Sequence, residues 1–514
     1  MLLKRCLAAT SLIGLLSLFS RAEEAKSDDP SKPVSYWRQI RTIFQANCTG
    51  CHQPAKAKGE LIMTDFAALI KGGADAGPGI VPGKPDESSV VKNITPGPDG
   101  KAEMPKKADP LRPQEISLIR QWIQEGGVDD TPAHARQVWD AEHPPVYAHA
   151  PLVTAIDFSP DGQLLAVSGF HETLLVRADN GALIGRLIGL SERIESVSFS
   201  PDGRRLAVAG GQPGRMGEVQ VWDVAEKKLV LSQPVTFDTV YGASWSPDGK
   251  NVAFGGADKS VRAIEADTGK QTFFVLTHED WVQDTAWSVK GDQVFSAGRD
   301  MTAKLSDFAT QRFIDNITSI TPGALRGGLQ ALSRHPERDE ILVGGSDGEP
   351  RLYRTNREVE RKIGDDSNLI RKFPPIEGRI WAADFAPDGK SFAVGGTRTD
   401  ENATGSLIKG IVAFYGCDVD SKLPEDLKAI LRKESFSRNA DEKAKVEAYL
   451  TQGVALLKKI ELPTGVYAVT YQPDGSFLAC AGADGLVRLL KPGDGTIAME
   501  LQPFPLSTVQ TAAK

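Results

Sequence analysis

The 514-residue sequence predicts two unlike parts, a small all-α domain followed by an all-β domain built from repeated units. Three observations predict this division. A Cys-x-x-Cys-His motif near the N-terminus lies between segments of helical period. A Pro-Asp-Gly turn recurs throughout the second half of the chain, and a polar, proline-rich stretch separates the two parts. A chain of this length also exceeds what one hydrophobic core usually serves, which favours two or three domains.

The motif is Cys48-Thr49-Gly50-Cys51-His52. Two thiols at this spacing can each form a thioether with a vinyl group of haem, and the adjacent histidine can ligate the iron. A zinc site would need about two further Cys or His ligands at short spacing, and His134, the next histidine, has no cysteine beside it. A redox Cys-x-x-Cys pair would follow a buried strand, whereas the residues before Cys48 have helical period. The motif therefore predicts one covalent haem c, bound through Cys48, Cys51 and His52.

Two helices are expected on either side of this motif. The first carries apolar residues at helical spacing and ends at Cys48; they are Tyr36, Trp37, Ile40, Ile43 and Phe44. The second runs from about Pro113 to Glu125. Pro113 suits a first turn, an apolar face follows, and Gly126-Gly127 ends the helix. The two helices are expected to pack against each other.

A sixth iron ligand is expected from one of two methionines. Met104 precedes Pro105 in a short polar loop before the last helix, and such a rigid turn can present a thioether to the iron. Met63 lies within Leu61-Ile62-Met63-Thr64, where a core-filling role is favoured. Met104 is therefore the predicted ligand, because a thioether opposite His52 raises the potential of an electron carrier.

The segment from 34 to 128 resembles the Planctomycete-type cytochrome c domain. The resemblance is carried by residues 44–52, Lys71-Gly72-Gly73, residues 77–85, Met104-Pro105 and Trp122-Ile123. It implies one haem c with His/Met ligation by His52 and Met104, and a glycine-proline loop from Gly72 to Pro85 that wraps the haem. The family usually has a second proline after its Met-Pro, where this chain has Lys106.

The N-terminus predicts export. Lys4 and Arg5 precede an apolar run from Cys6 to Phe19, and Ser20-Arg21-Ala22 offers small residues to a signal peptidase. The run is short for a membrane span, and no later stretch could cross a bilayer. The net charge of −7, without a Lys/Arg block, argues against nucleic acid and against a polybasic anchor. The expected location is the periplasm or cell envelope, where haem c is attached in the bacteria that this sequence resembles.

The second half repeats a turn of the form Ser-Pro-Asp-Gly. Its second residue recurs at intervals of 41 to 51 residues and then 86 residues, against about 40–45 for a WD-repeat blade. The seven copies begin at Ser159, Ser200, Ser246, Ser288, Arg334, Ala386 and Gln472, and those at Ser288 and Arg334 are degenerate. Each follows an alternating strand and precedes a small-apolar strand, so the copies predict a seven-bladed WD-repeat-like β-propeller.

Further features refine this prediction. Trp222-Asp223 ends a third strand as in a WD repeat, and turn aspartates that tie blades together are expected at Asp258, Asp300, Asp347 and Asp484. The longest interval predicts a helical hairpin, from Pro424 to Ser435 and from Asn439 to Leu457, between the third and fourth strands of the sixth blade. The expected divisions are a signal peptide (1–22), a flexible leader (23–32), a cytochrome c domain (33–128), a linker (129–144) and the propeller (145–505), with the helical insertion at about 419–457.

Two further cysteines, Cys417 and Cys480, lie in or beside apolar strands and are expected to be buried thiols. An exported protein also permits a disulfide between them, and that alternative stays open.

Three functions compete. The first is electron transfer through the haem to redox partner proteins, with the propeller as a docking or scaffold domain. The second is a periplasmic redox enzyme whose propeller holds a substrate or second cofactor. The third is a haem-containing scaffold or sensor. An enzyme would need converging groups, and the propeller proper offers only His171, His278 and His335. His335 lies in a repeated turn position, and the other two have no visible companion. A propeller fold does not by itself indicate a function. Electron transfer is therefore favoured because of the haem motif. The oligomeric state is left open.

Overall fold

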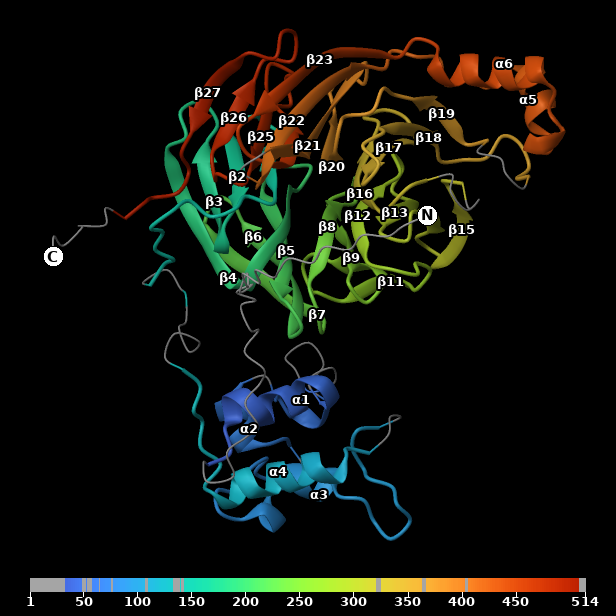
Figure 1. The fold of residues 1–514 in the computed structure, drawn as a ribbon. Helices are drawn as coiled ribbons and strands as arrows, with labels where there is room; N and C mark the ends of the chain where they lie inside the picture. Colours follow the sequence, from blue (N-terminus) through green and yellow to red (C-terminus); the bar gives the residue numbers. More distant parts are fainter. Residues whose placement is uncertain are drawn as a thin grey trace, which may run out of the picture.

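The structure is a computed structural model that describes residues 33–48, 52, 58–63, 65–74, 77–106, 110–132, 139, 143–319, 325–362, 367–402 and 405–507. The predicted signal peptide, the predicted leader and Cys51 lie outside these residues. A helical region and a β-propeller-like region are visible as separate bodies (Figure 1). Within the described residues, no helix has the length and apolar character needed to span a membrane.

The helical region contains the two predicted helices and several shorter ones. Its elements are a π-helical turn η1 (Tyr36–Ile40), α1 (Arg41–Asn47), η3 (Lys58–Glu60), α2 (Phe66–Lys71), η4 (Pro85–Glu87), α3 (Ser89–Ile94) and α4 (Pro113–Gln124). Local sequence explains several of the ends. The Ser35 hydroxyl accepts a hydrogen bond from Arg38 N at the start of η1, and the Asp65 carboxylate caps α2. Pro113 occupies the first turn of α4, as predicted.

Trp122 of α4 is the centre of this region's core. Its side chain is 1% exposed, and its ring stacks on Tyr36 with the centroids 5.4 Å apart. It also meets Phe44 of α1 edge-on at 6.5 Å, while its indole N–H donates to Val128 O. Aromatic contacts of this kind add to the area that they bury. The first and last helices therefore pack together, as the sequence predicted.

The residues expected to open the linker belong to this same body. Trp37 N and the Ser35 hydroxyl both donate to the carboxylate of Asp130, at 2.8 and 2.5 Å. The chain entering the helical region is thus tied to the chain leaving it.

The second region consists of antiparallel strands in six sheets. The first sheet has seven strands, β1 (Ile156–Phe158), β2 (Leu164–Ser168), β3 (Phe170–Arg177), β4 (Leu183–Phe199), β5 (Arg205–Gln212), β6 (Met216–Asp223) and β7 (Lys228–Thr236). Three four-stranded sheets follow: β8 (Val240–Trp245), β9 (Asn251–Gly256), β10 (Val261–Glu265) and β11 (Gln271–Val275); β12 (Val282–Trp287), β13 (Gln293–Gly298), β14 (Ala303–Asp307) and β15 (Arg312–Asn316); β16 (Leu329–Arg334), β17 (Glu340–Gly345), β18 (Arg351–Arg354) and β19 (Leu369–Lys372). The last two are β20 (Arg379–Phe385), β21 (Ser391–Asn402), β22 (Gly405–Gly416) and β23 (Ala455–Leu462), then β24 (Val466–Tyr471), β25 (Leu478–Gly482), β26 (Val487–Leu490) and β27 (Ile497–Leu501).

The long strand β4 explains why one sheet is larger than the others. Its first half pairs with β3 and its second half with β5, so it serves as the last strand of one unit and the first strand of the next. The innermost strands β1, β4, β8, β12, β16, β20 and β24 contact one another in turn, and β24 also contacts β1. They form a closed ring around the centre of the region (Figure 1).

Each repeated turn joins the first and second strands of a unit. In the copy at residues 159–162, Gly162 N donates to Ser159 O, and Gln163 N donates to the Asp161 carboxylate. Gly162 has φ +69, a conformation that favours glycine. The alternating strand expected before this turn is short in the structure, where β1 spans only Ile156–Phe158.

The ring is closed by contacts between the two ends of the region. Val153 N donates to Gly482 O, and Tyr147 forms a parallel bridge with Leu506. The Tyr147 and Phe504 rings also meet edge-on at 5.3 Å. No strand is shared between the first and last sheets. The ring is therefore closed by side chains and by the segments that flank these two sheets.

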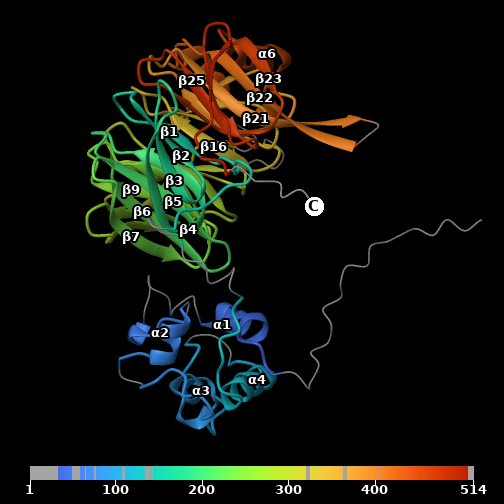
Figure 2. The same cartoon turned by 90° about the vertical axis from the view of Figure 1, so that its left-hand side faces the viewer.

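The predicted helical insertion lies between β22 and β23, as α5 (Glu425–Leu431), a short η6 (Ser435–Ser437) and α6 (Ala440–Thr451). The prediction that helix continues to Leu457 is wrong. α6 ends at Thr451, Gly453 adopts φ +72, and Ala455 begins β23. Residues 455–462 lie on an outer strand and are mostly exposed, apolar and charged side chains alike, so their pattern does not distinguish strand from helix. β21 and β22 extend beyond their sheet as a long hairpin (Figure 2).

Cys417 and Cys480 are both buried thiols, as favoured from the sequence. They pack in two different clusters of the core, and burial raises the pKa of each to about 12.

Candidate functional site

Cys48 and His52 stand at the end of α1. Cys48 is the C-terminal cap of this helix, and its N–H donates to Phe44 O at 2.8 Å. His52 N donates in turn to Cys48 O at 3.0 Å, so a single turn of backbone relates the two residues. Cys48 is partly exposed and packs against the Trp122 core, while His52 is 8% exposed. The helix therefore presents the first thiol of the motif at the edge of an apolar core and keeps the imidazole largely out of water.

Met104 packs against the same core from another direction. It is partly buried, and its N–H donates to Asn93 O at the end of α3. Met63 is 4% exposed inside the core, which agrees with the filling role expected for it. Its N–H donates to His52 O at 2.8 Å, so it lies beside the histidine through the backbone. The structure thus brings Cys48 and Met104 to one core and His52 beside it; ligation by Met104 stays a prediction.

The glycine loop expected to wrap a haem makes close backbone contacts of its own. A Cβ on Gly79 would lie 2.0 Å from Leu69 O, and one on Gly72 would lie 2.1 Å from Gly77 O. These glycines allow the loop to pack against α2. Contacts within the protein chain are therefore enough to explain why glycine is needed at these two positions, with no contribution from a haem.

The donor set fits a c-type haem. A thiol at a helix end, a largely buried imidazole and a thioether on the same apolar core are the groups that such a haem uses, and an apolar surround favours its retention. Among the described residues, no three His, Cys, Asp or Glu side chains cluster as ligands for another metal ion.

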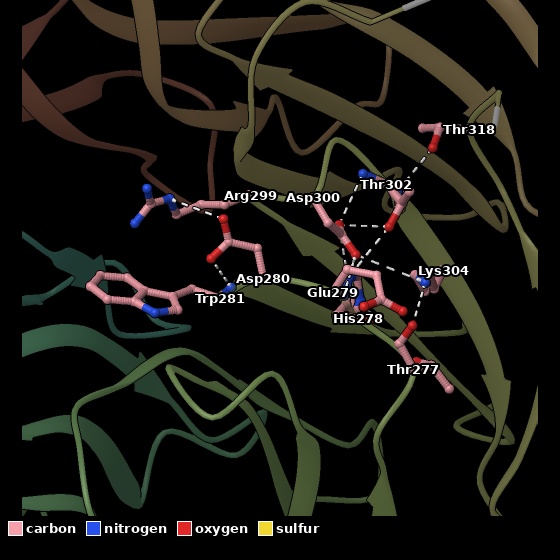
Figure 3. A network of polar contacts seen from close by, with 12 residues as sticks. Thr277, His278, Glu279, Asp280, Trp281, Arg299, Asp300, Thr302, Lys304 and Thr318 are labelled. Atoms are coloured by element: carbon pink, nitrogen blue, oxygen red, sulfur yellow. Dashed lines mark hydrogen bonds and ion pairs between the residues drawn. The ribbon is translucent and has the colours of Figure 1, made fainter. Parts of the chain in front are cut away.

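His278 has companions that the sequence did not reveal. Its Nδ1 lies 3.0 Å from the Asp300 carboxylate and its Nε2 lies 2.8 Å from the Ser296 hydroxyl (Figure 3). Burial alone would raise the pKa of Asp300, but hydrogen bonds from His278, Glu279 N and Thr302 lower it to about 2. The expectation that His278 stands alone is therefore wrong, because partners from other turns reach it only in the fold.

This Asp–His–Ser chain has the connectivity of a hydrolase triad, yet its serine cannot meet a substrate. Ser296 is 2% exposed and His278 is 3% exposed. A nucleophile must be reachable by the bond that it attacks. These hydrogen bonds instead join the segment before β12 to the turn between β13 and β14, which is a structural role.

The other predicted turn aspartates hold arginines four residues later. Arg262 binds Asp258 at 2.6 Å, Arg351 binds Asp347 at 2.8 Å, and Arg488 binds Asp484 at 2.6 Å. Arg262 also donates to Val235 O of the preceding sheet. At this position the aspartate does tie neighbouring units together, through its arginine.

A funnel of about 560 Å³ opens at one end of the ring of inner strands. Seven equivalent residues line it, one from each inner strand or the residues just before it: Thr154, Glu195, Tyr241, Gln283, Gln330, Trp381 and Tyr467. At five of them the register of the inner strand shifts around that one residue, and at Tyr241 it shifts just after it. A β-bulge turns a side chain away from its regular direction, and bulges are common beside functional sites.

Sequence reasoning missed these residues although a signal for them exists. Each lies six positions before the second residue of a repeated turn. Each also follows a buried aliphatic residue; these are Val153, Ile194, Val240, Val282, Leu329, Ile380 and Val466. Aligning the seven copies on their turns would have placed these residues at one equivalent position of the repeat.

Comparison with known proteins gives two families. Residues 48–108 match the family model of Planctomycete cytochrome C. Residues 143–176, 228–264, 269–307 and 456–490 match the WD domain, G-beta repeat. Both resemblances drawn from the sequence are confirmed.

Three relatives are similar to the second part of the chain. The APC/C activator protein CDC20 of Saccharomyces cerevisiae is 28% identical over 202 residues, which are 37% of this chain and 31% of that protein. Eukaryotic translation initiation factor 3 subunit I of Danio rerio is 22% identical over 178 residues, 34% of this chain and 53% of that protein. Mitotic checkpoint protein bub-3 of Caenorhabditis elegans is 27% identical over 294 residues, 57% of this chain and 70% of that protein. The chain thus spans about a third to a half of the first two of these relatives.

Proposed function

We propose that this chain, which joins a Planctomycete cytochrome C region to WD repeats, is an exported c-type cytochrome that transfers electrons to and from redox partner proteins. The observation that carries the proposal is the placement of Cys48 and Met104 on one apolar core, with His52 largely buried beside it. Such a haem supplies a one-electron Fe(III)/Fe(II) couple. The N-terminal segment with Lys4, Arg5 and the apolar run to Phe19 supports export to the periplasm or cell envelope.

Each residue of the site has a distinct task in this proposal. Cys48 and Cys51 would hold the group through two thioethers, and α1 would fix the first of them in place. His52 would supply the proximal nitrogen and Met104 the thioether of the sixth ligand. The enclosing core, centred on Trp122, would exclude water and thereby favour the reduced, less charged state.

The propeller would serve as the docking or scaffold part. We count its seven-stranded sheet as two blades, because β4 completes one four-stranded unit and begins the next. This gives seven blades, in agreement with the seven turns. The names of similar proteins and the WD repeats support a role in protein–protein contact. Docking for electron transfer needs only a small, transient interface.

Haem attachment is the test. The mature chain, exported by a host with a c-type maturation system, should retain one haem through acid–acetone extraction and give a pyridine haemochrome spectrum of haem c. Cys48→Ala and Cys51→Ala should each lose one thioether, which shifts the haemochrome α-band to longer wavelength. Cys417→Ala is the matched control and should retain the parent spectrum, because Cys417 lies in the propeller core. Haem that is fully extractable from the parent chain, or absent after correct export, would overturn the proposal.

A redox enzyme is the second candidate, and the funnel of the propeller is the observation that favours it. The funnel offers a carboxylate, amides and aromatic rings in one cavity. Turnover of a substrate that requires both regions in one chain, and is lost in Trp381→Ala with the haem intact, would favour an enzyme over a carrier.

A further inference from the structure

The seven funnel residues differ in chemistry around the ring. The inner strands contact one another in sequence order, so the order around the ring is Thr154, Glu195, Tyr241, Gln283, Gln330, Trp381 and Tyr467, then Thr154 again. Aromatic rings stand on two sides, with Tyr241 on one and the Trp381–Tyr467 pair on the other. Polar side chains fill the two arcs between them. A molecule in the funnel would therefore meet rings at its faces and hydrogen-bonding groups at its edges.

The aromatic walls are held in place by other side chains. The Trp381 indole N–H donates to the Thr397 hydroxyl at 2.9 Å, and its ring meets Tyr467 at 5.5 Å. Tyr241 stacks on Trp281 with the centroids 6.0 Å apart. Because these rings are already ordered, binding against them costs little additional side-chain entropy.

The polar arcs supply both donors and acceptors. Gln283 and Gln330 each carry an amide, which has two donor hydrogens and an acceptor oxygen. Gln283 Nε2 is buried, and it donates to no group within the part of the chain that the structure describes. A ligand in the funnel would reach this atom after a rotation of the Gln283 side chain, which would give the amide an acceptor that it lacks here.

The charges around the funnel nearly balance. Glu192 and Glu195 line the cavity beside Arg193. Next to the lining, the Arg379 guanidinium lies 5.0 Å from the Trp381 ring centroid, and Arg299 covers the Trp281 ring and lies 3.9 Å from Asp280. The electrostatic potential of the funnel therefore does not favour a strongly charged ligand of either sign. The cavity of about 560 Å³ also suits a small molecule or short chain and excludes a folded domain.

We propose that the funnel binds a neutral oligosaccharide. A pyranose ring has two apolar C–H faces and an edge of hydroxyl groups, and this matches aromatic walls that alternate with amide, carboxylate and hydroxyl arcs. Trp381 and Tyr241 would contact the faces of sugar rings, and Gln283, Gln330 and Glu195 would bind their hydroxyls. The inference uses only propeller residues and does not depend on the haem.

Binding can be screened with the intact mature chain on an array of neutral and acidic glycans. Neutral oligosaccharides that bind on the array would then be titrated by calorimetry and by quenching of tryptophan fluorescence. We expect saturable binding of at least one neutral oligosaccharide. The affinity should fall by about tenfold or more in Trp381→Ala and in Gln283→Ala, as for central contact residues in other interfaces.

Two further variants keep this test decisive. Trp381→Phe retains an aromatic wall and should recover part of the affinity, whereas misfolding would abolish it. Phe436→Ala removes an aromatic side chain that is 79% exposed on the helical insertion, and it should bind as the parent chain does. The proposal is overturned if no neutral glycan on the array binds the chain, or if Phe436→Ala loses as much affinity as Trp381→Ala. Funnel-dependent selection of peptides from a display library, without glycan binding, would assign the site to peptides instead.

Discussion

Glu172 offers a stringent test of how the propeller closes. Its side chain is fully buried on β3, and both its oxygens are engaged. Arg186 Nε lies 2.5 Å from Oε2, and the Tyr147 hydroxyl donates to Oε1 at 2.7 Å. Arg186 also donates to Pro145 O. Through Tyr147, which bridges to Leu506, this carboxylate holds both ends of the propeller chain.

Replacing Glu172 by Ala would leave the Arg186 guanidinium, whose side chain is 19% exposed, without its counter-charge. Removing one partner of a buried ion pair costs about 3–5 kcal/mol of unfolding free energy. Tyr147→Phe loses the hydrogen bond to Glu172 and the one that the hydroxyl accepts from Phe170 N, and should cost about 1–3 kcal/mol. The phenol remains a donor across the usual pH range, because burial and the Glu172 hydrogen bond raise the pKa of Tyr147.

Urea unfolding of the mature chain, followed by far-UV circular dichroism at pH 7, measures these losses, while haem absorbance follows the helical region separately. Glu226→Ala, at an exposed carboxylate on a turn, is the matched control and should change stability by less than about 0.5 kcal/mol. A loss below about 1 kcal/mol in Glu172→Ala, or one no larger than in Tyr147→Phe, would refute the role of this buried pair.

Two further predictions concern the iron ligand and the buried carboxyl group of Asp157. Met104→Ala should abolish the methionine-to-iron charge-transfer band and lower the potential, whereas Met63→Ala should keep the band and cost about 2–5 kcal/mol of stability; the opposite pattern would exchange their roles. Burial raises the pKa of Asp157 from 3.8 to about 7. Between these values the folded chain binds a proton that the unfolded chain releases, so its contribution to stability falls as pH rises from about 4 to 7 and is constant above. Asp157→Asn should reduce that slope in urea midpoints measured from pH 5 to 8, and an unchanged slope would contradict the assignment.

The sequence predicted the elements whose evidence is local. The helical period before Cys48, Pro113 at the start of a helix and the repeated Pro-Asp-Gly turns all depend on residues within one or two turns of each other. The structure contains each of them where expected. Met104 was singled out by its neighbour Pro105 and lies on the core with Cys48, although the sequence could not tell its distance from His52.

What the sequence did not predict depends on contacts between distant turns. His278 finds Asp300 and Ser296 only because the segment that connects two sheets before β12 lies beside β13 and the turn that follows it. β4 joins two units without a break, since both halves find hydrogen-bonding partners and no glycine or proline turn interrupts it. At residues 455–457 the sequence instead predicted too much helix, because β22 supplies backbone hydrogen-bonding partners to this segment and it forms the start of β23.

The end of the propeller that carries the funnel also carries a turn that contacts the helical region. In an antiparallel sheet, the start of the first strand lies at the end where the second strand turns into the third. The funnel residues are at or near the start of each inner strand, and Phe170, at the turn between β2 and β3, lines the funnel as well. Arg215 occupies the matching turn between β5 and β6, and its guanidinium lies 5.5 Å from the Trp37 ring at the start of the helical region. Under the proposed function, a molecule held in the funnel would therefore be bound at the end of the propeller from which the β5–β6 turn reaches the haem-bearing part.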